Sequence, residues 1–419
     1  MRTGIEVDEA RRLVLDGIAP LPPETVTVTD ALGRVLASAV VAGRTLPPAD
    51  CSAMDGYAVR TSDLAGAKPA APRELAVAFE VAAGGRAARP LRAGEAARIF
   101  TGAPLPEGAD GVVMQEDTDS AGDRVRCYVA PAPGAHVRLA GEDVRAGETV
   151  LEPGIRLGAA HVGVLASLGR SYVQVHRRPR VAILSGGDEL VEPDADFAGG
   201  RIVASNAYSL AAQCAEAGAL VTQLGIARDT PEALERGLRA GLGADVLVSS
   251  AGVSVGDHDH VRPVLEKLGC RLVFWGVRMK PGYPLAFGRF EADAGPRVFG
   301  LPGNPVSAMV TFEQFVRPVL LALGGRTVWA RPVVRARVAE PMRKQAGRLH
   351  FVRVTLAREG PRWVARSTGN QSSGVLRSMA LAHGLLVFPA EATELAAGST
   401  ADVQVLDADV LAGPEPPSA

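Results

Sequence analysis

The sequence predicts a multidomain α/β protein built around a doubly wound, mostly parallel sheet. Three observations lead to this prediction. The chain has 419 residues, which is too long for one ordinary domain. Short apolar strands alternate with helical segments between residues 178 and 329, a pattern typical of a parallel sheet flanked by helices. Strand-like runs broken by Gly and Pro lie on both sides of that stretch.

The N-terminal segment is expected to form a helix and then an extended segment, residues 25–41. Apolar residues between Val7 and Leu15 recur near helical spacing, and three prolines between Pro20 and Pro23 end the helix. Further along, residues 161–168 predict an apolar helix and residues 172–175 a short strand. We expect these parts to form one elongated helix-strand domain that is interrupted by a β-rich insertion.

The α/β stretch contains recognisable helix starts and stops. Ser205 is expected to cap one helix, which Gly218 ends, and Thr230 to cap the next, with Pro231 at its first position. A further helix is expected over residues 254–268. The predicted strands are residues 181–185, 220–226, 246–250, 285–288 and 298–301.

The last stretch returns to strands. Phe351, Arg353 and Thr355 alternate with apolar neighbours, which is the period of a β-strand, and a small C-terminal β-barrel is expected. The predicted domains are residues 1–45 with 144–177 (elongated first domain), 46–143 (inserted β-rich domain), 178–329 (α/β domain), 330–411 (barrel) and 412–419 (tail).

Composition excludes several classes of function. The chain is 47% hydrophobic and its formal net charge is −1, so no broad basic field is available for nucleic acid or an acidic membrane. No apolar run reaches the roughly 18–20 residues of a membrane helix, and a cytoplasmic location is expected. The four cysteines, Cys51, Cys127, Cys214 and Cys270, lie far apart and are expected to be reduced, buried thiols.

Small and polar residues follow three predicted strands, at the sheet edge where open parallel sheets bind ligands. Residues 186–189 are Gly-Gly-Asp-Glu, residues 251–257 are Ala-Gly-Val-Ser-Val-Gly-Asp, and residues 302–307 are Pro-Gly-Asn-Pro-Val-Ser. The second loop precedes a helix and offers backbone N–H groups to a phosphate or another oxyanion. For each loop taken alone, an ordinary polar turn is the alternative interpretation.

Charged residues near these loops suggest a cation and an anion site. Asp257 and Asp259 lie beside the phosphate loop, and a bound Mg²⁺ would relieve their repulsion of a phosphate, although they also suit the start of a helix. Lys280 on a rigid Lys-Pro-Gly turn suits an oxyanion, but a surface lysine is the alternative. Asp229 precedes the Thr230 cap and needs no function. His258 and His260 do not have the spacing of a zinc site on one helix face.

Longer motifs in a fixed order carry a family resemblance. The chain resembles the molybdopterin molybdenumtransferase family, called MoeA in bacteria, which includes the gephyrin E domain, and the match covers nearly the whole chain. The matching segments are residues 52–58, 98–106, 112–116, 141–143, 185–190, 252–256, 279–282 and 301–307.

The resemblance implies a homodimer of elongated four-domain subunits, with each site between the sheet domain of one subunit and the second and fourth domains of the other. It implies a Mg²⁺-dependent transferase that takes adenylylated molybdopterin and molybdate, forms molybdenum cofactor and releases AMP. It also names molybdopterin adenylyltransferase and the apoproteins of molybdoenzymes as candidate partners.

Carried over residue by residue, the family pattern implies three groups of site residues, with Asp55 and Thr101 reaching in from the partner subunit. The implied catalytic residues are Asp55, Thr101, Glu189, Asp229, Asp259 and Lys280. The implied metal ligands are Glu189, Asp257 and Asp259. The implied substrate-binding residues are Asp143, Gly252, Ser254, Gly256, Pro302, Gly303, Asn304, Pro305, Arg353 and Ser373.

The sequence departs from the family pattern at three places. Ala251 replaces a common Gly, a cation shortly before the Lys280 turn is absent or displaced to Arg278, and Tyr283 replaces a frequent Lys. The change at Ala251 is expected to be tolerated, whereas the two changes near Lys280 predict weaker anion affinity or a different anion. Tungstate stays open as an alternative to molybdate, because the two oxyanions have nearly the same size and charge.

Two other classes of function stay open. The sheet domain alone would also suit a molybdopterin adenylyltransferase that uses ATP, but the matching first, second and fourth stretches favour metal insertion. A scaffold of the gephyrin kind, or a non-catalytic carrier of pterin or molybdate, is the alternative outside the enzymes.

Overall fold

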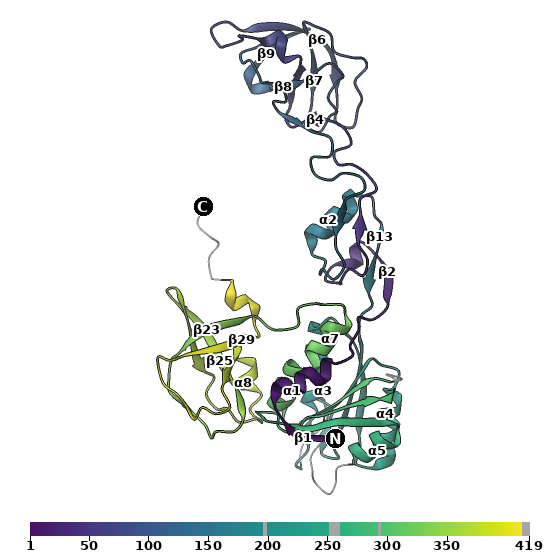
Figure 1. Cartoon of the computed structure of the whole chain (residues 1–419), viewed down its shortest axis with the longest axis vertical. Coiled ribbons are helices and arrows are strands. Elements are labelled where there is room, and N and C mark those ends of the chain that lie inside the picture. The colour runs from purple at the N-terminus through teal and green to yellow at the C-terminus, as the bar shows by residue number, and fades with distance from the viewer. Residues whose placement is uncertain (196–198, 251–259, 292–294, 413–419) are drawn as a thin grey trace. The chain divides into compact units, whose positions relative to one another are not determined.

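The computed structural model describes residues 1–195, 199–250, 260–291 and 295–412 (Figure 1). The chain divides into two compact units. The first, here called the sheet-and-barrel unit, comprises Met1–Ala37, Gly154–Gly158 and Tyr172–Ala419, and the second, the inserted unit, comprises Ser38–Pro153 and Ala159–Ser171. Each unit is described by itself below. The boundaries of the four domains expected from the sequence stay a prediction.

A seven-stranded, mostly parallel sheet forms the centre of the sheet-and-barrel unit, as the sequence predicts. Only β21 runs antiparallel to its neighbours, β19 and β22. In spatial order the strands are β1 (Arg2–Ile5), β19 (Cys270–Val277), β21 (Ala286–Phe290), β22 (Arg297–Leu301), β18 (Val246–Ser250), β14 (Arg180–Gly186) and β17 (Leu220–Ala227).

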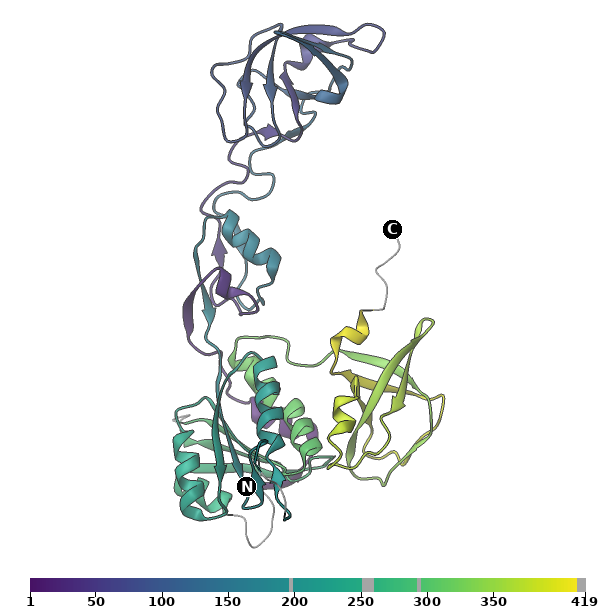
Figure 2. The ribbon, with the colours of Figure 1, turned by 180° about the vertical axis from the view of Figure 1, so that it is seen from behind.

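Helices cover both faces of this sheet because successive side chains of each buried strand point to opposite faces. In β14, Val181 and Ile183 pack on one face, whereas Ala182 and Leu184 pack on the other. The first face is covered by α1 (Val7–Leu15), α3 (Ser205–Glu216), α6 (Pro305–Thr311), the π-helical turn η5 (Phe312–Val316) and α7 (Arg317–Leu323); the second is covered by α4 (Pro231–Ala240) and α5 (Val261–Lys267) (Figures 1 and 2).

One local expectation needs correction, and one strand pairing could not be predicted. Residues 2–5 pair in parallel with β19 and complete the edge of the sheet. Period-two and period-3.6 patterns cannot show which distant strand an edge strand joins. Ser205 is the first helical residue and not the cap, because Ala204 holds the cap position without a side-chain hydrogen bond. Thr230 does cap α4, and its hydroxyl accepts from the Ala233 N–H at 3.3 Å.

Among the described residues, one helical stretch has the length and average composition of a membrane-crossing helix. Pro305–Leu323 spans 19 residues, and its most apolar window has a mean hydropathy of 1.4, although Glu313, Gln314 and Arg317 interrupt the apolar residues. Of that window, 83% is buried inside the structure, as in the core helix of a folded domain. Glu313 is buried and paired with Arg331 at 3.0 Å.

A closed barrel of five strands follows the sheet, in agreement with the sequence. The strands β25, β26, β23, β29 and β27 pair in that order, and β27 returns to β25. Their bounds are β23 (Val333–Val338), β25 (Leu349–Glu359), β26 (Arg362–Ser367), β27 (Gly384–Phe388) and β29 (Thr400–Val405), with the short pair β24 (Met342–Arg343) and β28 (Glu394–Leu395), helix α8 (Arg377–Ala380) and the 3₁₀ turn η6 (Ala408–Leu411).

Short two-stranded pairs complete the sheet-and-barrel unit. The segment expected to be extended over residues 25–41 contains β2 (Pro23–Thr27), the 3₁₀ turn η1 (Thr29–Ala31) and, in the inserted unit, β3 (Val40–Val41). β2 pairs antiparallel with β13 (Tyr172–His176), and β15 (Leu190–Val191) pairs with β16 (Ile202–Val203).

The inserted unit is β-rich, as its Gly- and Pro-rich sequence predicts. A six-stranded sheet encloses apolar clusters around Val59 on one face and Ile99 on the other. In order the strands are β8 (Gly111–Met114), β5 (Gly56–Val59), β7 (Glu95–Ile99), β6 (Arg73–Val81), β10 (Arg124–Cys127) and β9 (Thr118–Ala121); the unit also contains β4 (Cys51–Ser52), β11 (Val137–Arg138), β12 (Thr149–Leu151), α2 (Ala159–Ser167), η2 (Thr61–Leu64) and η3 (Gln115–Asp117).

The four cysteines, Cys51, Cys127, Cys214 and Cys270, are all free and buried, which confirms the expectation of structural thiols. Burial raises the pKa of the Cys214 thiol to about 12, so this thiol stays protonated and unreactive at neutral pH.

Phe299 is the core position at which we predict the largest cost of truncation. It is fully buried on the central strand β22, and its ring lies 5.0 Å from that of Phe287. Phe299→Ala should lower the free energy of unfolding by about 3–5 kcal/mol, because it removes buried area and leaves a cavity. Phe299→Leu should cost less than about 1.5 kcal/mol. Urea denaturation of both variants checks this, and equal losses would contradict it.

Candidate functional site

Four parallel strands end in register at one edge of the sheet. Ser185 of β14 is paired with Ser250 of β18, and Ser250 with Leu301 of β22, while Ile226 of β17 lies on the other side of Ser185. The hydroxyl groups of Ser185 and Ser250 lie 3.2 Å apart and buried, so they form a hydrogen bond across the two strands. The loops that follow these strands therefore share one edge, as the sequence predicts.

Carboxylates gather in the loops after β14 and β17. Asp188, Glu189 and Asp229 are all exposed, and the Asp229 N–H donates to Asp188 Oδ1 at 3.3 Å. Gly187 has a φ of +149°, and a Cβ there would lie 2.7 Å from Glu189 Oε2. A side chain at position 187 would force the Glu189 carboxylate to move, and the positive φ itself favours glycine at this position.

The glycine loop after β18 lies outside the described residues. Five predicted site residues belong to it: Gly252, Ser254, Gly256, Asp257 and Asp259. Among the residues that the structure does describe, no three His, Cys, Asp or Glu side chains gather into a group that could hold a metal ion. Glu189 is thus the described member of the predicted Mg²⁺ site.

The loop after β22 meets the barrel. Residues 302–305 follow Leu301, and the Asn206 side chain donates from Nδ2 to the Gly303 carbonyl at 2.7 Å. The Val306 N–H, at the start of α6, donates to the carbonyl of Ser373 at 3.1 Å. The structure therefore brings together Ser373 of the barrel and the predicted substrate loop Pro302, Gly303, Asn304 and Pro305.

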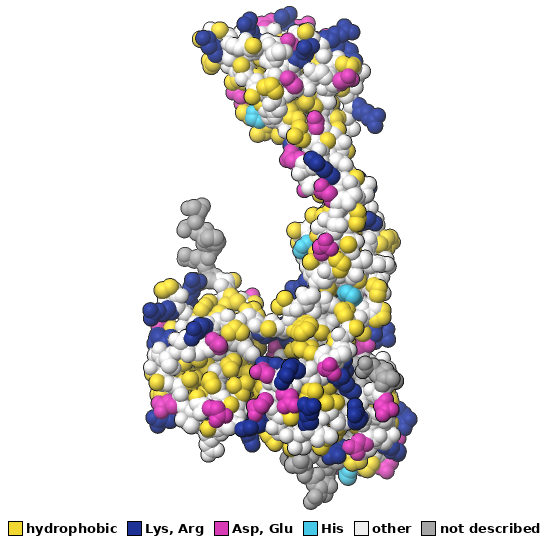
Figure 3. Space-filling view, in the orientation of Figure 1, with side chains coloured by type: hydrophobic (Ala, Val, Ile, Leu, Met, Phe, Trp, Pro, Cys, Tyr) yellow, Lys and Arg dark blue, Asp and Glu magenta, His cyan; other side chains and the backbone are white. Residues whose placement is uncertain are grey.

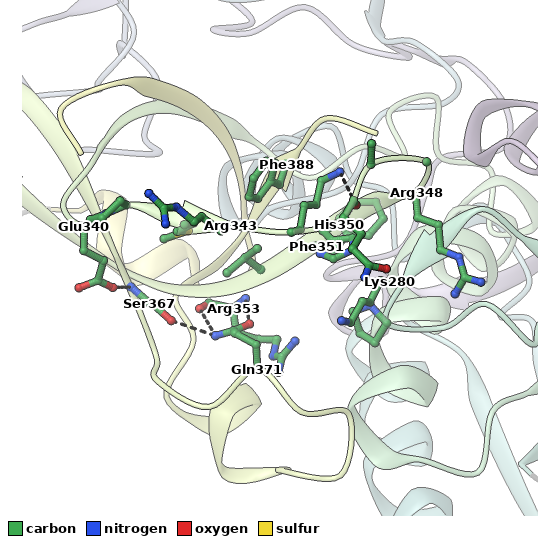
Figure 4. A pocket seen from close by; sticks show the side chains of 18 residues that line it. Lys280, Glu340, Arg343, Arg348, His350, Phe351, Arg353, Ser367, Gln371 and Phe388 are labelled. Carbon is green, nitrogen blue, oxygen red and sulfur yellow. Dashed lines mark hydrogen bonds between the residues drawn. The ribbon is translucent and has the colours of Figure 1, made fainter. Parts of the chain in front are cut away.

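Lys280 lies in a groove where the barrel joins the sheet. The two-residue strand β20 (Met279–Lys280) pairs in parallel with β25, with Lys280 opposite His350. The groove has a volume of about 1080 Å³, and its cationic lining residues are Lys280, Arg343, Lys344, Arg348 and Arg353, with Glu340 at one end (Figure 4). Basic and acidic side chains are interspersed on the face in Figure 3, whereas this groove collects cations.

Arg353 is held rigidly beneath the groove. It is only 1% exposed, and burial lowers the pKa of its guanidinium to about 10. Its Nε donates to Ser378 Oγ at 3.2 Å and its Nη2 to the Ser372 carbonyl at 3.2 Å. Arg353 thus fixes the loop that contains Ser373, so it also orders the barrel part of the site.

His350 is the one titratable ring among the groove residues, and it stays neutral at physiological pH. Burial, and then the charges of Lys280, Lys344 and Arg348, lower its pKa from 6.5 to about 4. The same charges are what an oxyanion would encounter in the groove.

Four groove residues were missed by the sequence analysis: Arg343, Lys344, Arg348 and His350. The signal that could have found them is the basic run 343–348 directly before a strand that carries Arg353. Sequence alone does not show that this run lies beside Lys280.

Asp55 and Thr101 form a pair in the inserted unit. Asp55 Oδ1 accepts from the Thr101 N–H at 2.7 Å and from the Thr101 hydroxyl at 2.8 Å. These two bonds, followed by the charge of Arg98, lower the pKa of the Asp55 carboxyl. Arg98 lies 5.1 Å from the rings of both Tyr57 and Phe100. The hydrogen bonds from Thr101 and the charge of Arg98 thus stabilise the ionised form of the Asp55 carboxyl group.

Asp143 also lies in the inserted unit, where it is exposed and its N–H donates to the Leu46 carbonyl at 3.1 Å. Asp55, Thr101 and Asp143 therefore belong to one unit, while the remaining described site residues belong to the other.

Comparisons with known proteins decide the family. Residues 5–169 match the MoeA N-terminal region (domains I and II), residues 182–322 match a probable molybdopterin binding domain, and residues 335–406 match the MoeA C-terminal region (domain IV). A molybdopterin molybdenumtransferase of Nostoc sp. is 40% identical over 392 residues, covering 91% of this chain and 88% of that protein. The chain belongs to the molybdopterin molybdenumtransferase family.

Other members of the family agree along almost the full length. Molybdopterin molybdenumtransferase 2 of Mycobacterium tuberculosis is 38% identical over 403 residues, covering 95% of this chain and 98% of that protein. The crystal structure of a molybdopterin biosynthesis MoeA protein from Pyrococcus horikoshii superposes with a TM-score of 0.80 at 30% identity, covering 96% of this chain and 100% of that chain. The resemblance and the fold class inferred from the sequence are confirmed.

The pKa of His350 gives a first test of the groove. NMR titration should place its midpoint near pH 4. Arg348→Gln and Lys280→Met should each raise that midpoint without restoring 6.5, because burial remains. Since the unfolded chain binds the proton more readily, the stability that this histidine contributes is present above pH 6.5 and is lost as the pH falls towards 4. A wild-type midpoint near 6.5 would contradict the buried, cation-lined groove.

Thr101→Val tests the carboxylate pair in the inserted unit. The variant keeps the backbone N–H that donates to Asp55 and loses only the hydroxyl donor. The pKa of Asp55 should rise in an NMR titration, since one of two hydrogen bonds to the charged form is gone. Thr101→Ser, which keeps the hydroxyl, serves as the control and should leave the pKa close to that of the wild type.

Proposed function

We propose that this chain is a molybdopterin molybdenumtransferase that takes adenylylated molybdopterin and molybdate, forms molybdenum cofactor and releases AMP. The observation that carries the proposal is the pairing of β20 with β25, which sets Lys280 in a cationic groove beside the barrel. A dianion such as molybdate, and the phosphates of a nucleotide-linked pterin, both require such a surface. The family names of its relatives support the same reaction class.

The proposed site has two parts, one at the sheet edge and one in the groove. The described part of the edge offers the loops after β14 and β22, including Gly303 and Asn304, for the phosphates of the substrate. Gly252, Ser254 and Gly256, which lie outside the described residues, are proposed to bind the same phosphates. Lys280, with Arg353 and Ser373 beside it, holds the molybdate or the pterin phosphate. We assign Asp229 to the same edge, since its N–H is bound to Asp188. No side-chain nucleophile is needed, because cleavage of the phosphoanhydride depends on orientation and on charge neutralisation.

Glu189, Asp257 and Asp259 suit a hard divalent cation, because Mg²⁺ takes carboxylate oxygens together with substrate phosphates. Glu189 fits this role, since its carboxylate is exposed and held beside Gly187 at the sheet edge. When bound there, Mg²⁺ would neutralise charge on the departing AMP. The protein's part is to fix those carboxylates and to leave the phosphates accessible.

We further propose that the chain acts as a cytoplasmic homodimer in which Asp55, Thr101 and Asp143 serve the site of the partner subunit. The lowered pKa of Asp55 supports this role, because its carboxylate stays charged for a cation or a hydrogen-bond donor. Molybdopterin adenylyltransferase and molybdoenzyme apoproteins are the proposed suppliers and recipients.

The alternatives make different demands on the same groove. An adenylyltransferase would consume ATP, whereas a carrier would bind the pterin or molybdate without releasing AMP. A scaffold of the gephyrin kind would need neither Lys280 nor the sheet-edge carboxylates. The cations collected in the groove and the exposed carboxylates at the edge favour the transferase.

AMP release from adenylylated molybdopterin, with Mg²⁺ and titrated molybdate, tests the proposal. Lys280→Ala and Glu189→Ala should each lower the rate by about 10²-fold, the size typical of a lost transition-state contact. Asp259→Ala should abolish release. Arg262→Ala, a variant of a surface residue paired with Glu266, should leave the rate unchanged.

Several outcomes would overturn the transferase. Bound substrate without AMP release would indicate a carrier or a scaffold, and formation of adenylylated pterin from ATP would indicate the adenylyltransferase. Parallel titrations with tungstate would show which oxyanion the groove prefers.

A further inference from the structure

The cationic side chains of the groove differ in whether their charged groups are already bonded to other groups of the protein. Lys344 donates from Nζ to the Ala390 carbonyl at 2.7 Å and lies 5.0 Å from the ring of Phe388. Arg343 is paired with Glu394 at 3.3 Å, and Arg353 is buried, with its Nε bonded to Ser378 and its Nη2 bonded to the Ser372 carbonyl. In the part of the chain that the structure describes, neither Lys280 nor Arg348 has a hydrogen bond or ion pair at its charged group. Of the groove cations, these two are therefore the least engaged by other groups of the protein.

Arg348 is exposed, yet an aromatic ring holds it in place. Its Cζ lies 4.5 Å from the centroid of the Tyr283 ring, within the range of a cation–π contact. Trp275 packs edge-on against that ring, with centroids 5.7 Å apart and planes at 82°. A Cβ on Gly276 would lie 3.2 Å from Tyr283 Cζ, so the ring packs closely against the backbone. Tyr283 is thus a fixed platform for the guanidinium.

The backbone beside Arg348 is fixed from the other side. Arg278 donates from Nε and Nη2 to the Gly347 carbonyl at 3.2 and 3.0 Å and pairs with Glu6 at 2.9 Å. Arg278 is therefore used to hold the loop and is not free to bind an anion.

We propose that Arg348, positioned by the Tyr283 ring, is an oxyanion-binding residue of this groove and that it acts together with Lys280 on a tetrahedral dianion. This inference rests on the proposed function and adds a binding residue to it. A lysine provides a compact point charge and an arginine a planar fork of donors, so the pair matches both the charge and the oxygens of molybdate or a phosphate. Both side chains line the groove (Figure 4), and the charges of both lower the pKa of His350.

The test measures anion binding without any pterin, by calorimetric titration of the full chain with sodium molybdate and, separately, with inorganic phosphate. Arg348→Gln should weaken binding of both anions by about tenfold or more, because a charge-assisted bond is lost. Tyr283→Leu should weaken binding by about two- to fivefold, since Arg348 keeps its charge but loses its platform. Tyr283→Phe keeps the ring and should bind like the wild type.

A matched control separates this effect from a general loss of positive charge. Arg358 also lies over an aromatic ring, 5.9 Å from the centroid of Trp363, but it does not line the groove. Arg358→Gln should therefore leave both affinities unchanged. Thermal melts and circular dichroism establish that each variant is folded, and Arg348→Lys, which restores the charge, should recover part of the affinity and would replace Tyr283→Leu if that variant does not fold.

Wild-type affinity in Arg348→Gln, or an equal loss in Arg358→Gln, would overturn the inference. A loss confined to phosphate would also overturn it, since molybdate would then bind elsewhere. The two proposals can fail separately. A chain that binds molybdate through Arg348 yet releases no AMP would contradict the transferase and leave the role of Arg348 intact.

Discussion

The site depends on the pairing of β20 with β25, a contact of only two residues between the sheet and the barrel. Met279 lies opposite Leu349 and Lys280 opposite His350, so one short ladder fixes the lysine against the strand that carries Arg353. A second bond, from the Val306 N–H to the Ser373 carbonyl, ties the loop after β22 to the barrel. Most of the groove is lined by the barrel, and the pairing of β20 with β25 adds Lys280 and Pro281 of the sheet to it.

The register of the sheet strands is fixed because the strands are buried on both faces. Val181 and Ile183 pack against one layer of helices, and Ala182 and Leu184 against the other, so a shift of one residue would exchange both sets. The register of Ser185, Ser250 and Leu301 at the ligand edge follows from that packing. The described loops after β14 and β22 can then contain Gly187 and Gly303, because the strands beneath them are fixed.

Local features of the sequence were enough to predict much of this structure. Strand periods, the Thr230 cap and the small residues after β14 and β22 are set by neighbouring residues, and they were found correctly. The rigid turn at Lys280 marked that residue as a candidate, and the family motifs added Arg353. The sequence could not show that Arg348 stacks on Tyr283, since 65 positions of chain separate them and only the barrel contact joins them. The same limit hid the edge pairing of β1, whose partner lies beyond residue 269.

That edge pairing has a consequence for how the protein is made. Arg2–Ile5 is synthesised long before its partner strand, Phe274–Val277. At about 5–20 residues per second, the N-terminal strand waits roughly 15–55 s for its place in the sheet. During translation the inserted unit, whose strands pair among residues 40–151, can complete its own sheets first. Folding is therefore expected to begin in the inserted unit, and Arg2–Ile5 is expected to pair with its partner strand only later.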